Sequence, residues 1–186
     1  MKTTNLNLKE ILKTKESLAI KARKHLVNTD AFTPEEIDTI MLTAKELKQS
    51  KKEFPLDLLK SSHVALAFFE NSTRTKCSFS IAATNLGANV LDLNISTSSS
   101  AKGETLVDTA ATLIEMGVNA YVQRHSESGS CSALVDSLGH NCSFINAGEG
   151  KEAHPTQALL DYFTMLEYSP DLKNKKVNII GDTRFS

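Results

Sequence analysis

The sequence predicts an α/β protein in which a doubly wound parallel sheet is flanked by helices, and two observations carry that prediction. Short apolar segments typical of buried strands alternate along the chain with longer segments of helical period. Several helical segments end at a glycine, as at Gly87, Gly117 and Gly139, where a left-handed residue commonly closes a helix. Alternating strands and helices indicate a parallel sheet covered on both faces, because right-handed crossovers return each helix to the sheet.

The first predicted helix follows a polar N-terminal segment. Residues 1–24 are Lys-rich and are expected to form an N-terminal extension or helix with a solvated face. Thr33 can cap the next helix, proline fits its first position, and Glu36 completes a capping box. The predicted helix is Pro34–Gln49, and the apolar positions of its buried face are Ile37, Ile40, Met41, Ala44 and Leu47.

The chain after Pro55 is expected to run from strand to helix to strand. His63–Phe69 is a short apolar run and is predicted to be a buried strand. The following segment, Thr75–Leu86, has helical character and ends at a glycine, and Ala88–Leu93 is predicted to be the second strand. The segment Asn94–Gly103 is polar and serine-rich, so we expect an exposed loop there.

The second half of the chain continues this alternation, with glycine and proline at helix ends and short apolar runs between the helices. The predicted elements are, in order, the helix Glu104–Met116, the strand Ala120–Gln123, the helix Gly129–Leu138, the strand Cys142–Ile145, the helix Pro155–Tyr168 and a fifth strand, Lys176–Ile180.

Composition argues against several functional classes. The formal net charge of −1 at pH 7 argues against a general nucleic-acid binder. No apolar run approaches the roughly 20 residues that cross a membrane, and the N-terminus lacks the apolar core of a signal peptide. Cys77, Cys131 and Cys142 are odd in number and lack the spacing of a metal site or a disulfide framework, which favours reduced thiols in a cytoplasmic protein.

Residues suited to a small anionic ligand follow each of the first four predicted strands, where ligands of doubly wound sheets bind. They are Ser72, Thr73, Arg74 and Thr75 after the first strand, Lys102 in the loop after the second, Arg124 and His125 after the third, and Asn146, Ala147, Gly148, His154 and Gln157 after the fourth. Each cluster alone has an ordinary structural explanation, as a helix cap, a surface charge or a surface loop. Their occurrence at one edge of one sheet indicates a site for a small anion.

These residue types suit charge stabilisation. Backbone N–H groups at a helix start bind anions, and the guanidinium of Arg74 can hold a phosphate bidentately. Lys102 lies in a polar loop that can close over a phosphate. Arg124 can bind a carbonyl or phosphate oxygen, and a neutral His154 at a helix N-terminus can donate to a carbonyl oxygen as negative charge develops. Neither a nucleophile–base–acid triad nor a metal cluster is visible, so the pattern predicts catalysis by positioning, with phosphate as leaving group.

The segment Phe68–Thr75 reads Phe-Phe-Glu-Asn-Ser-Thr-Arg-Thr and, with Ser78-Phe79, resembles the carbamoyl-phosphate motif of the aspartate/ornithine carbamoyltransferase family. The segments that resemble the aspartate branch of the family are Lys102–Thr105, Arg124-His125, Asn146–Gly150 and His154–Asp161. The similarity runs from about His25 to Ser186. The sequence departs from the family pattern at Asn71, Ser126 and Glu149, while every matched contact position is intact.

The resemblance implies a role for each matching residue. The residues that would hold the phosphate of carbamoyl phosphate are Ser72, Thr73, Arg74 and Thr75. Arg124, His154 and Gln157 would hold its carbonyl and amide end, with the first two polarising the carbonyl. Ser98 and Lys102 would reach into the active site of a neighbouring subunit, which implies a homotrimer with shared sites. The catalytic roles fall to Arg74, Lys102, Arg124 and His154, and no metal or organic cofactor is implied.

The resemblance also divides the chain into a carbamoyl-phosphate-binding domain over residues 25–170 and, over 171–186, the start of an aspartate-binding domain whose remainder the sequence lacks. It implies transfer of the carbamoyl group to L-aspartate in pyrimidine biosynthesis, and we expect the chain alone to turn over poorly. The alternatives are a non-catalytic carbamoyl-phosphate-binding fragment or pseudoenzyme, and a carbamoyltransferase for ornithine or another amino acid. Regulatory chains are a further partner that the family allows.

Overall fold

The fold is built on a parallel four-stranded sheet with the strand order β2-β1-β3-β4, seen here in a computed structural model. The structure describes residues 10, 13, 24–49, 56–93 and 104–181. The strands are β1 (His63–Phe68), β2 (Asn89–Leu93), β3 (Ala120–His125) and β4 (Ser143–Glu149). Parallel pairing places all four carboxyl ends at one edge of the sheet, as the sequence predicts.

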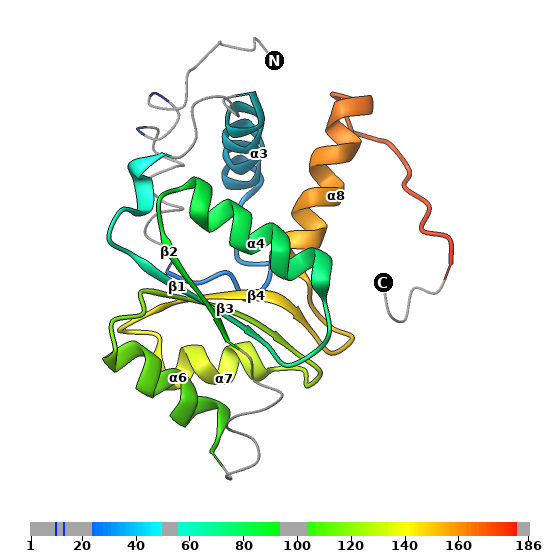
Figure 1. Cartoon of the computed structure of the whole chain (residues 1–186). Coiled ribbons are helices and arrows are strands. Elements are labelled where there is room, and N and C mark those ends of the chain that lie inside the picture. Colours follow the sequence, from blue (N-terminus) through cyan, green and yellow to red (C-terminus); the bar gives the residue numbers. More distant parts are fainter. Residues whose placement is uncertain (1–9, 11–12, 14–23, 50–55, 94–103, 182–186) are drawn as a thin grey trace.

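Helices cover both faces of this sheet (Figure 1). The α-helices are α3 (Pro34–Gln49), α4 (Thr73–Asn85), α6 (Leu106–Glu115), α7 (Ser130–Leu138) and α8 (Pro155–Tyr168), and a short 3-10 helix, η1, covers Asp57–Leu59. The helices α3, α4 and α8 lie on one side of the sheet, and α6 and α7 lie on the other. The predicted α/β class, with a parallel sheet between two helical layers, is therefore confirmed.

The sheet divides the core into two apolar layers. Tyr121 and Phe144 are fully buried on the face that α7 covers, where they pack with Leu134. Leu66 and Val122 point to the opposite face, which α4 covers. Successive strand residues alternate between the two faces, and each fully buried side chain of this size stabilises the fold by about 1.5–3 kcal/mol.

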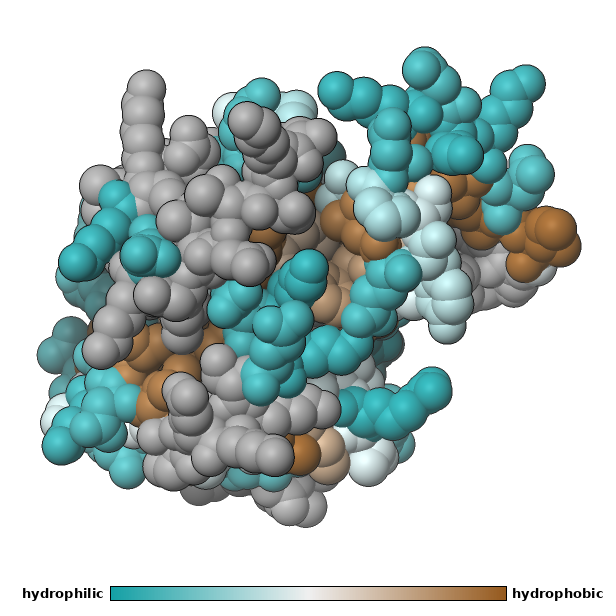
Figure 2. Space-filling model, turned by 90° about the horizontal axis from the view of Figure 1, so that it is seen from above, coloured by the Kyte–Doolittle hydropathy of each residue, from teal (hydrophilic) through white to brown (hydrophobic). Residues whose placement is uncertain are grey.

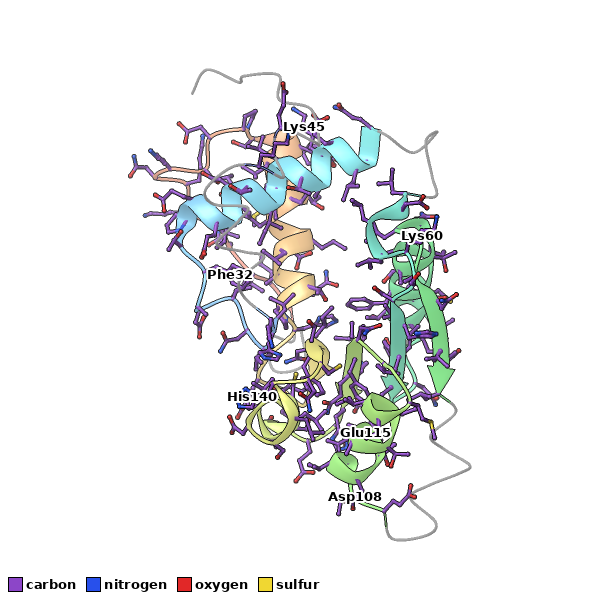
Figure 3. All side chains as sticks on the ribbon, turned by 90° about the vertical axis from the view of Figure 1, so that its left-hand side faces the viewer. Phe32, Lys45, Lys60, Asp108, Glu115 and His140 are labelled. Atoms are coloured by element: carbon purple, nitrogen blue, oxygen red, sulfur yellow. The ribbon has the colours of Figure 1, made fainter. Side chains whose placement is uncertain are left out.

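Local signals place several helix ends. The predicted capping box of α3 is confirmed: the Thr33 N–H donates to Glu36 Oε2 over 2.8 Å, and the Glu36 N–H donates to Thr33 Oγ1 over 3.2 Å. A second capping box, between Thr105 and Asp108, starts α6 and was not among the predictions. Asp108 lies in the first turn of α6 and Glu115 at its other end (Figure 3).

The segment before α3 adds a short extension to the sheet. Leu26 forms a parallel bridge with Ile145, in which its N–H donates to the Phe144 carbonyl and its carbonyl accepts from the Asn146 N–H, each over 2.9 Å. His25 stacks on the ring of Phe144. The segment therefore lies along the open side of β4. The predicted extension over residues 1–24 lies almost entirely outside the described residues.

The structure corrects several predicted boundaries. The strands β3 and β4 extend to His125 and Glu149, so Arg124 and Asn146 lie within strands and not in loops after them. The helix α4 starts at Thr73, two positions before the predicted Thr75. The strands β3 and β4 are longer than predicted because their pairing with neighbouring strands continues beyond the apolar run. This pairing depends on tertiary contacts, which an apolar run in the sequence does not predict.

The predicted fifth strand over Lys176–Ile180 is wrong. These residues form no strand and pair with none of the described strands. Val177, Ile179 and Ile180 are 60%, 75% and 93% exposed, and hydrophobic atoms are visible at the right-hand edge in Figure 2, where this segment lies. An apolar run becomes a strand only when it finds an edge to pair with, and here it finds none.

Two further features bear on the predicted class of protein. None of the helices in the described ranges is both long and apolar enough to cross a membrane. The three cysteines carry free thiols; Cys77 is exposed, while Cys131 and Cys142 are buried.

Candidate functional site

The first part of the site is the start of α4, directly after β1. Ser72 occupies the N-cap position, but its side chain makes no capping hydrogen bond. The first helical hydrogen bond runs from the Lys76 N–H to the Ser72 carbonyl over 3.0 Å. The N–H groups of residues 73–75 therefore lack an acceptor within the helix and can bind an anion.

Arg74 adds a cation to this helix start. Its side chain is exposed and, within the part of the chain that the structure describes, forms no ion pair. Thr73 is exposed beside it, and Ser72 and Thr75 are half-buried. The predicted phosphate-binding residues thus surround one helix N-terminus, with a guanidinium available for a bidentate contact.

Arg124 connects three strand ends. It lies opposite Phe68 in the sheet, and its carbonyl accepts the Phe69 N–H over 2.9 Å. Its side chain is largely buried: Nη1 donates to the Ala147 carbonyl over 3.0 Å, and Nε lies 3.5 Å from Glu70 Oε2. The second distance makes an ion pair but no hydrogen bond, so the buried Nε–H has no hydrogen-bond acceptor among the residues that the structure describes.

Gly148 brings Arg124 together with His154. Its φ of +116° belongs to the region that favours glycine. A Cβ at this position would lie 2.5 Å from Arg124 Nη1 and 3.2 Å from His154 Cδ2. The guanidinium and the imidazole therefore both approach the face of Gly148 where a side chain would be, and two residues predicted from different strand ends meet at one place.

His154 occupies the N-cap position of α8, where it is half-buried. Burial lowers the pKa of its imidazole, the charge of Arg124 lowers it further, and Asp161 opposes the shift. The sequence predicts a neutral imidazole from the helix dipole; the structure supports a neutral form, with burial as the largest cause. A neutral imidazole keeps one N–H, which can donate to a carbonyl oxygen.

Gln157 and the two loop residues complete the predicted set. Gln157 lies in the first turn of α8, exposed, and its amide nitrogen donates to Asp161 Oδ1 over 2.9 Å. To contact a ligand, it would exchange this bond for one to the ligand. Ser98 and Lys102 lie outside the described residues. Among the described residues, no group of three or more His, Cys, Asp or Glu could hold a metal ion.

Sequence reasoning did not assign roles to Glu70, Asn146 or Gly148. Glu70 is an acid directly after a buried strand, beside the motif already singled out. Asn146 and Gly148 lie in a strand that also ends near Gly150. Glycine inside a strand pattern signals a bulge or a close backbone approach, and that signal could have identified Gly148.

Comparison with known proteins assigns the fold and this edge cluster to a family. The family described as aspartate/ornithine carbamoyltransferase, carbamoyl-P binding domain, matches residues 24–167. The chain belongs to this family. The carbamoyltransferase match includes β1 to β4 and nearly all of α8, and so covers every site residue described above.

Relatives and solved structures of carbamoyltransferases agree with this assignment. The chain is 45% identical over 163 residues to the aspartate carbamoyltransferase catalytic subunit of Sulfurimonas denitrificans and 47% identical over 164 residues to that of Campylobacter lari, covering 88% of this chain and 54% of each relative. It also resembles aspartate transcarbamoylase from Trypanosoma cruzi in complex with carbamoyl phosphate and aspartate, with a TM-score of 0.74 and 31% identity, over 80% of this chain and 49% of that one. The chain spans about half the length of the curated relatives it matches.

Proposed function

We propose that the chain binds carbamoyl phosphate as part of an aspartate carbamoyltransferase, which converts carbamoyl phosphate and L-aspartate into N-carbamoyl-L-aspartate and phosphate in pyrimidine biosynthesis. The observation that carries the proposal is the packing of Arg124 and His154 against Gly148, at the same sheet edge as the open start of α4. An anion site beside a pair of groups suited to a carbonyl oxygen fits carbamoyl phosphate, which has both parts.

The ligand would lie across the carboxyl edge of the sheet. Its phosphate would take the free N–H groups and hydroxyls at the start of α4, with Arg74 as counter-charge. Its carbonyl oxygen would accept from Arg124 and from the neutral imidazole of His154, and its amide would face Gln157. Glu70 would keep the Arg124 side chain near this place by charge attraction.

The reaction would proceed by charge stabilisation. The neutral amine of L-aspartate attacks the carbamoyl carbon, a C–N bond forms, and the carbonyl electron pair moves onto oxygen. Arg124 and His154 stabilise that oxyanion because both are held in place before it forms. The oxyanion's electron pair then re-forms the carbonyl as the C–O bond breaks, phosphate leaves with the electron pair of that bond, and the nitrogen gives up a proton to the departing phosphate. The phosphate-binding groups at α4 lower the energy of the leaving group.

The names of the relatives favour aspartate as the second substrate over ornithine, because the relatives described above are aspartate enzymes. In the proposed assembly, catalytic chains form a homotrimer in the cytoplasm, and Ser98 and Lys102 complete the site of a neighbouring subunit. Sedimentation velocity would test the trimer. Transfer assays with L-aspartate and L-ornithine would test the substrate, and carbamoyl-ornithine formation would contradict the aspartate assignment.

Calorimetric titration with carbamoyl phosphate tests the binding step directly. We expect the 186-residue chain to bind it, and Arg74→Ala and Arg124→Ala to weaken binding by about ten- to a hundredfold each, because a charge-assisted hydrogen bond contributes about 1.5–3 kcal/mol. Lys60→Ala is the matched control. Lys60 is exposed and lies just before β1, at the amino end of that strand and so away from the carboxyl edge that carries the site. Equal affinity of wild type and both arginine variants would overturn the proposed site.

A further inference from the structure

The strand β4 contains an irregularity beside Arg124. Gln123 pairs with Asn146 and His125 pairs with Glu149, so β4 takes three residue steps where β3 takes two. The extra residue falls within Ala147–Gly148. This is the geometry of a β-bulge, which bends a strand and redirects its groups, often next to a functional site.

The side-chain amide of Asn146 connects this bulge to the N-terminal segment through two hydrogen bonds. It is fully buried, its Nδ2 donates to the Val27 carbonyl over 3.0 Å, and its Oδ1 accepts the Gly148 N–H over 2.8 Å. Its backbone N–H donates to the Leu26 carbonyl over 2.9 Å. Because the bulge interrupts the ladder at Gly148, the Asn146 side chain supplies the acceptor that the neighbouring strand does not.

The bulge in turn sets the distance between the two groups of the site. It directs the Ala147 carbonyl toward Arg124 Nη1, which donates to it over 3.0 Å. It also places the side-chain-free face of Gly148 against both the guanidinium and the His154 ring, where not even a methyl group would fit. A displaced bulge would therefore move both the acceptor of Arg124 and the backbone surface against which Arg124 and His154 pack.

We infer that Asn146 is a positioning residue, which ties the segment Leu26–Val27 to the bulge of β4 and thereby holds Arg124 and His154 together. We call this connection of Leu26–Val27, Asn146 and the β4 bulge the clamp, and it is a property of the ligand-free chain. Its effect on carbamoyl phosphate rests on the proposed function. The N-terminal segment, far from the ligand in sequence, thus becomes part of what supports the site.

In the variant Asn146→Ala, the positioning of Arg124 and His154 and the binding of carbamoyl phosphate are measured separately. NMR titration of the ligand-free chain follows the pKa of His154, which burial and Arg124 lower and Asp161 raises. We expect this pKa to rise toward the ordinary imidazole value, because Arg124 moves away and water enters. Calorimetry with carbamoyl phosphate should show binding weakened on the order of tenfold, as expected for loss of a supporting hydrogen bond.

Two control variants separate positioning from general loosening. Asn119→Ala removes another side-chain amide that bonds to the backbone: Asn119 Oδ1 accepts the His63 N–H at the opposite edge of the same sheet. Val118→Ala removes buried packing at that edge. Neither should change the pKa of His154. Leu26→Pro loosens the clamp from its other end by removing the N–H that donates to Phe144, and should raise the pKa in the same direction; it decides the question if Asn146→Ala fails to fold.

The outcomes are distinct. A raised His154 pKa in Asn146→Ala or Leu26→Pro, with unchanged controls, supports the clamp. An unchanged pKa in the folded clamp variants overturns it, and so does an equal rise in the controls. If wild type fails to bind carbamoyl phosphate while the pKa still rises only in the clamp variants, the proposed ligand is wrong and the positioning role stands.

Discussion

Arg124 and His154 both pack against the side-chain-free face of one glycine, yet the pair carries a single positive charge at neutral pH. The guanidinium stays charged under all ordinary conditions, and burial, followed by the charge of Arg124, lowers the pKa of the imidazole. The result is one cation and one neutral donor, both available to the same carbonyl oxygen. At the residue scale, close packing at Gly148 is what creates this pair.

Gly148→Ala should disrupt the site beyond its effect on the backbone. The added methyl group would meet Arg124 Nη1 at 2.5 Å, so the guanidinium must move. Gly117→Ala is the matched control, because Gly117 has a similar φ of +101° but no atom of the described residues lies within 4 Å of its added Cβ. We expect both variants to lose about 1–2 kcal/mol of unfolding free energy from backbone strain, and only Gly148→Ala to lose carbamoyl phosphate binding by more than about tenfold. Equal binding in the two variants would contradict this.

Acidification should destabilise the fold through two histidines. Burial is the largest cause that lowers the pKa of both His25 and His154 in the folded chain, with Lys24 and Arg124 as the next causes. The unfolded chain therefore binds protons that the folded chain does not once the pH falls below about 6.5. The unfolding free energy should be highest above that pH and decrease as the pH falls toward the folded pKa values.

Urea unfolding between about pH 7.5 and pH 5 measures this dependence. His154→Asn should show a smaller loss over the same range, because one of the two groups is removed. Parallel curves for wild type and variant would exclude a contribution from His154.

Helix starts differ according to what they must do. The starts of α3 and α6 are closed by capping boxes, whereas Ser72 leaves the start of α4 without a side-chain cap. At the start of α7, a residue far away in the sequence provides the acceptor: Glu149 Oε2 accepts from the Cys131 N–H over 3.0 Å and from Ser130 Oγ over 3.3 Å. Among the described α-helices, α4 and α8 start without a side-chain capping hydrogen bond, and both starts belong to the proposed site.

Thr33→Ala should cost about 1 kcal/mol of unfolding free energy, because it removes the hydrogen bond of the α3 capping box in which Thr33 Oγ1 accepts the Glu36 N–H. Thr43→Ala is the control within the same helix. Thr43 Oγ1 bonds to the Thr39 carbonyl in mid-helix, where alanine has the better helix propensity. Chemical denaturation of both variants checks the difference, and equal destabilisation would show that the cap contributes nothing specific.

The whole molecule combines a well-packed sheet with an exposed apolar segment. The largest fully buried side chains lie in the layers on the two faces of the sheet, for example Tyr121 and Phe144 on one face and Leu66 on the other. The segment after α8 has apolar residues of comparable character, but they contact little and lie in solvent. In this segment, unlike in the sheet, the apolar side chains are therefore not buried.

This contrast predicts unequal effects of removing apolar side chains. Ile180→Ser should change the unfolding free energy by no more than about 0.5 kcal/mol, since Ile180 is 93% exposed. Phe144→Ala should cost about 3–5 kcal/mol, because its ring is fully buried between β4 and α7. Amide exchange should also be fast over Lys176–Ile180 and slow over β3. Slow exchange in the first segment would show that it packs in solution.

Much of the fold could be predicted because its signals are local. The bounds of α3 and α8 match those expected from the sequence, since a threonine cap and a proline act within one helical turn. The order of strands and helices follows from the hydrophobic period, and the candidate residues follow from the rule that ligands bind at the carboxyl ends of parallel strands.

What only the tertiary structure decided depends on residues far apart in the chain. The contact from Arg124 to Ala147 spans 23 positions and that from Asn146 to Val27 spans 119, and no local pattern reports either. The apolar run at Lys176–Ile180 has strand character but finds no strand to pair with. The sequence by itself thus determined the elements and the edge where they present polar groups. The meeting of Arg124 with His154 required the bulge in β4, because a one-residue change in strand register exists only once two strands are paired.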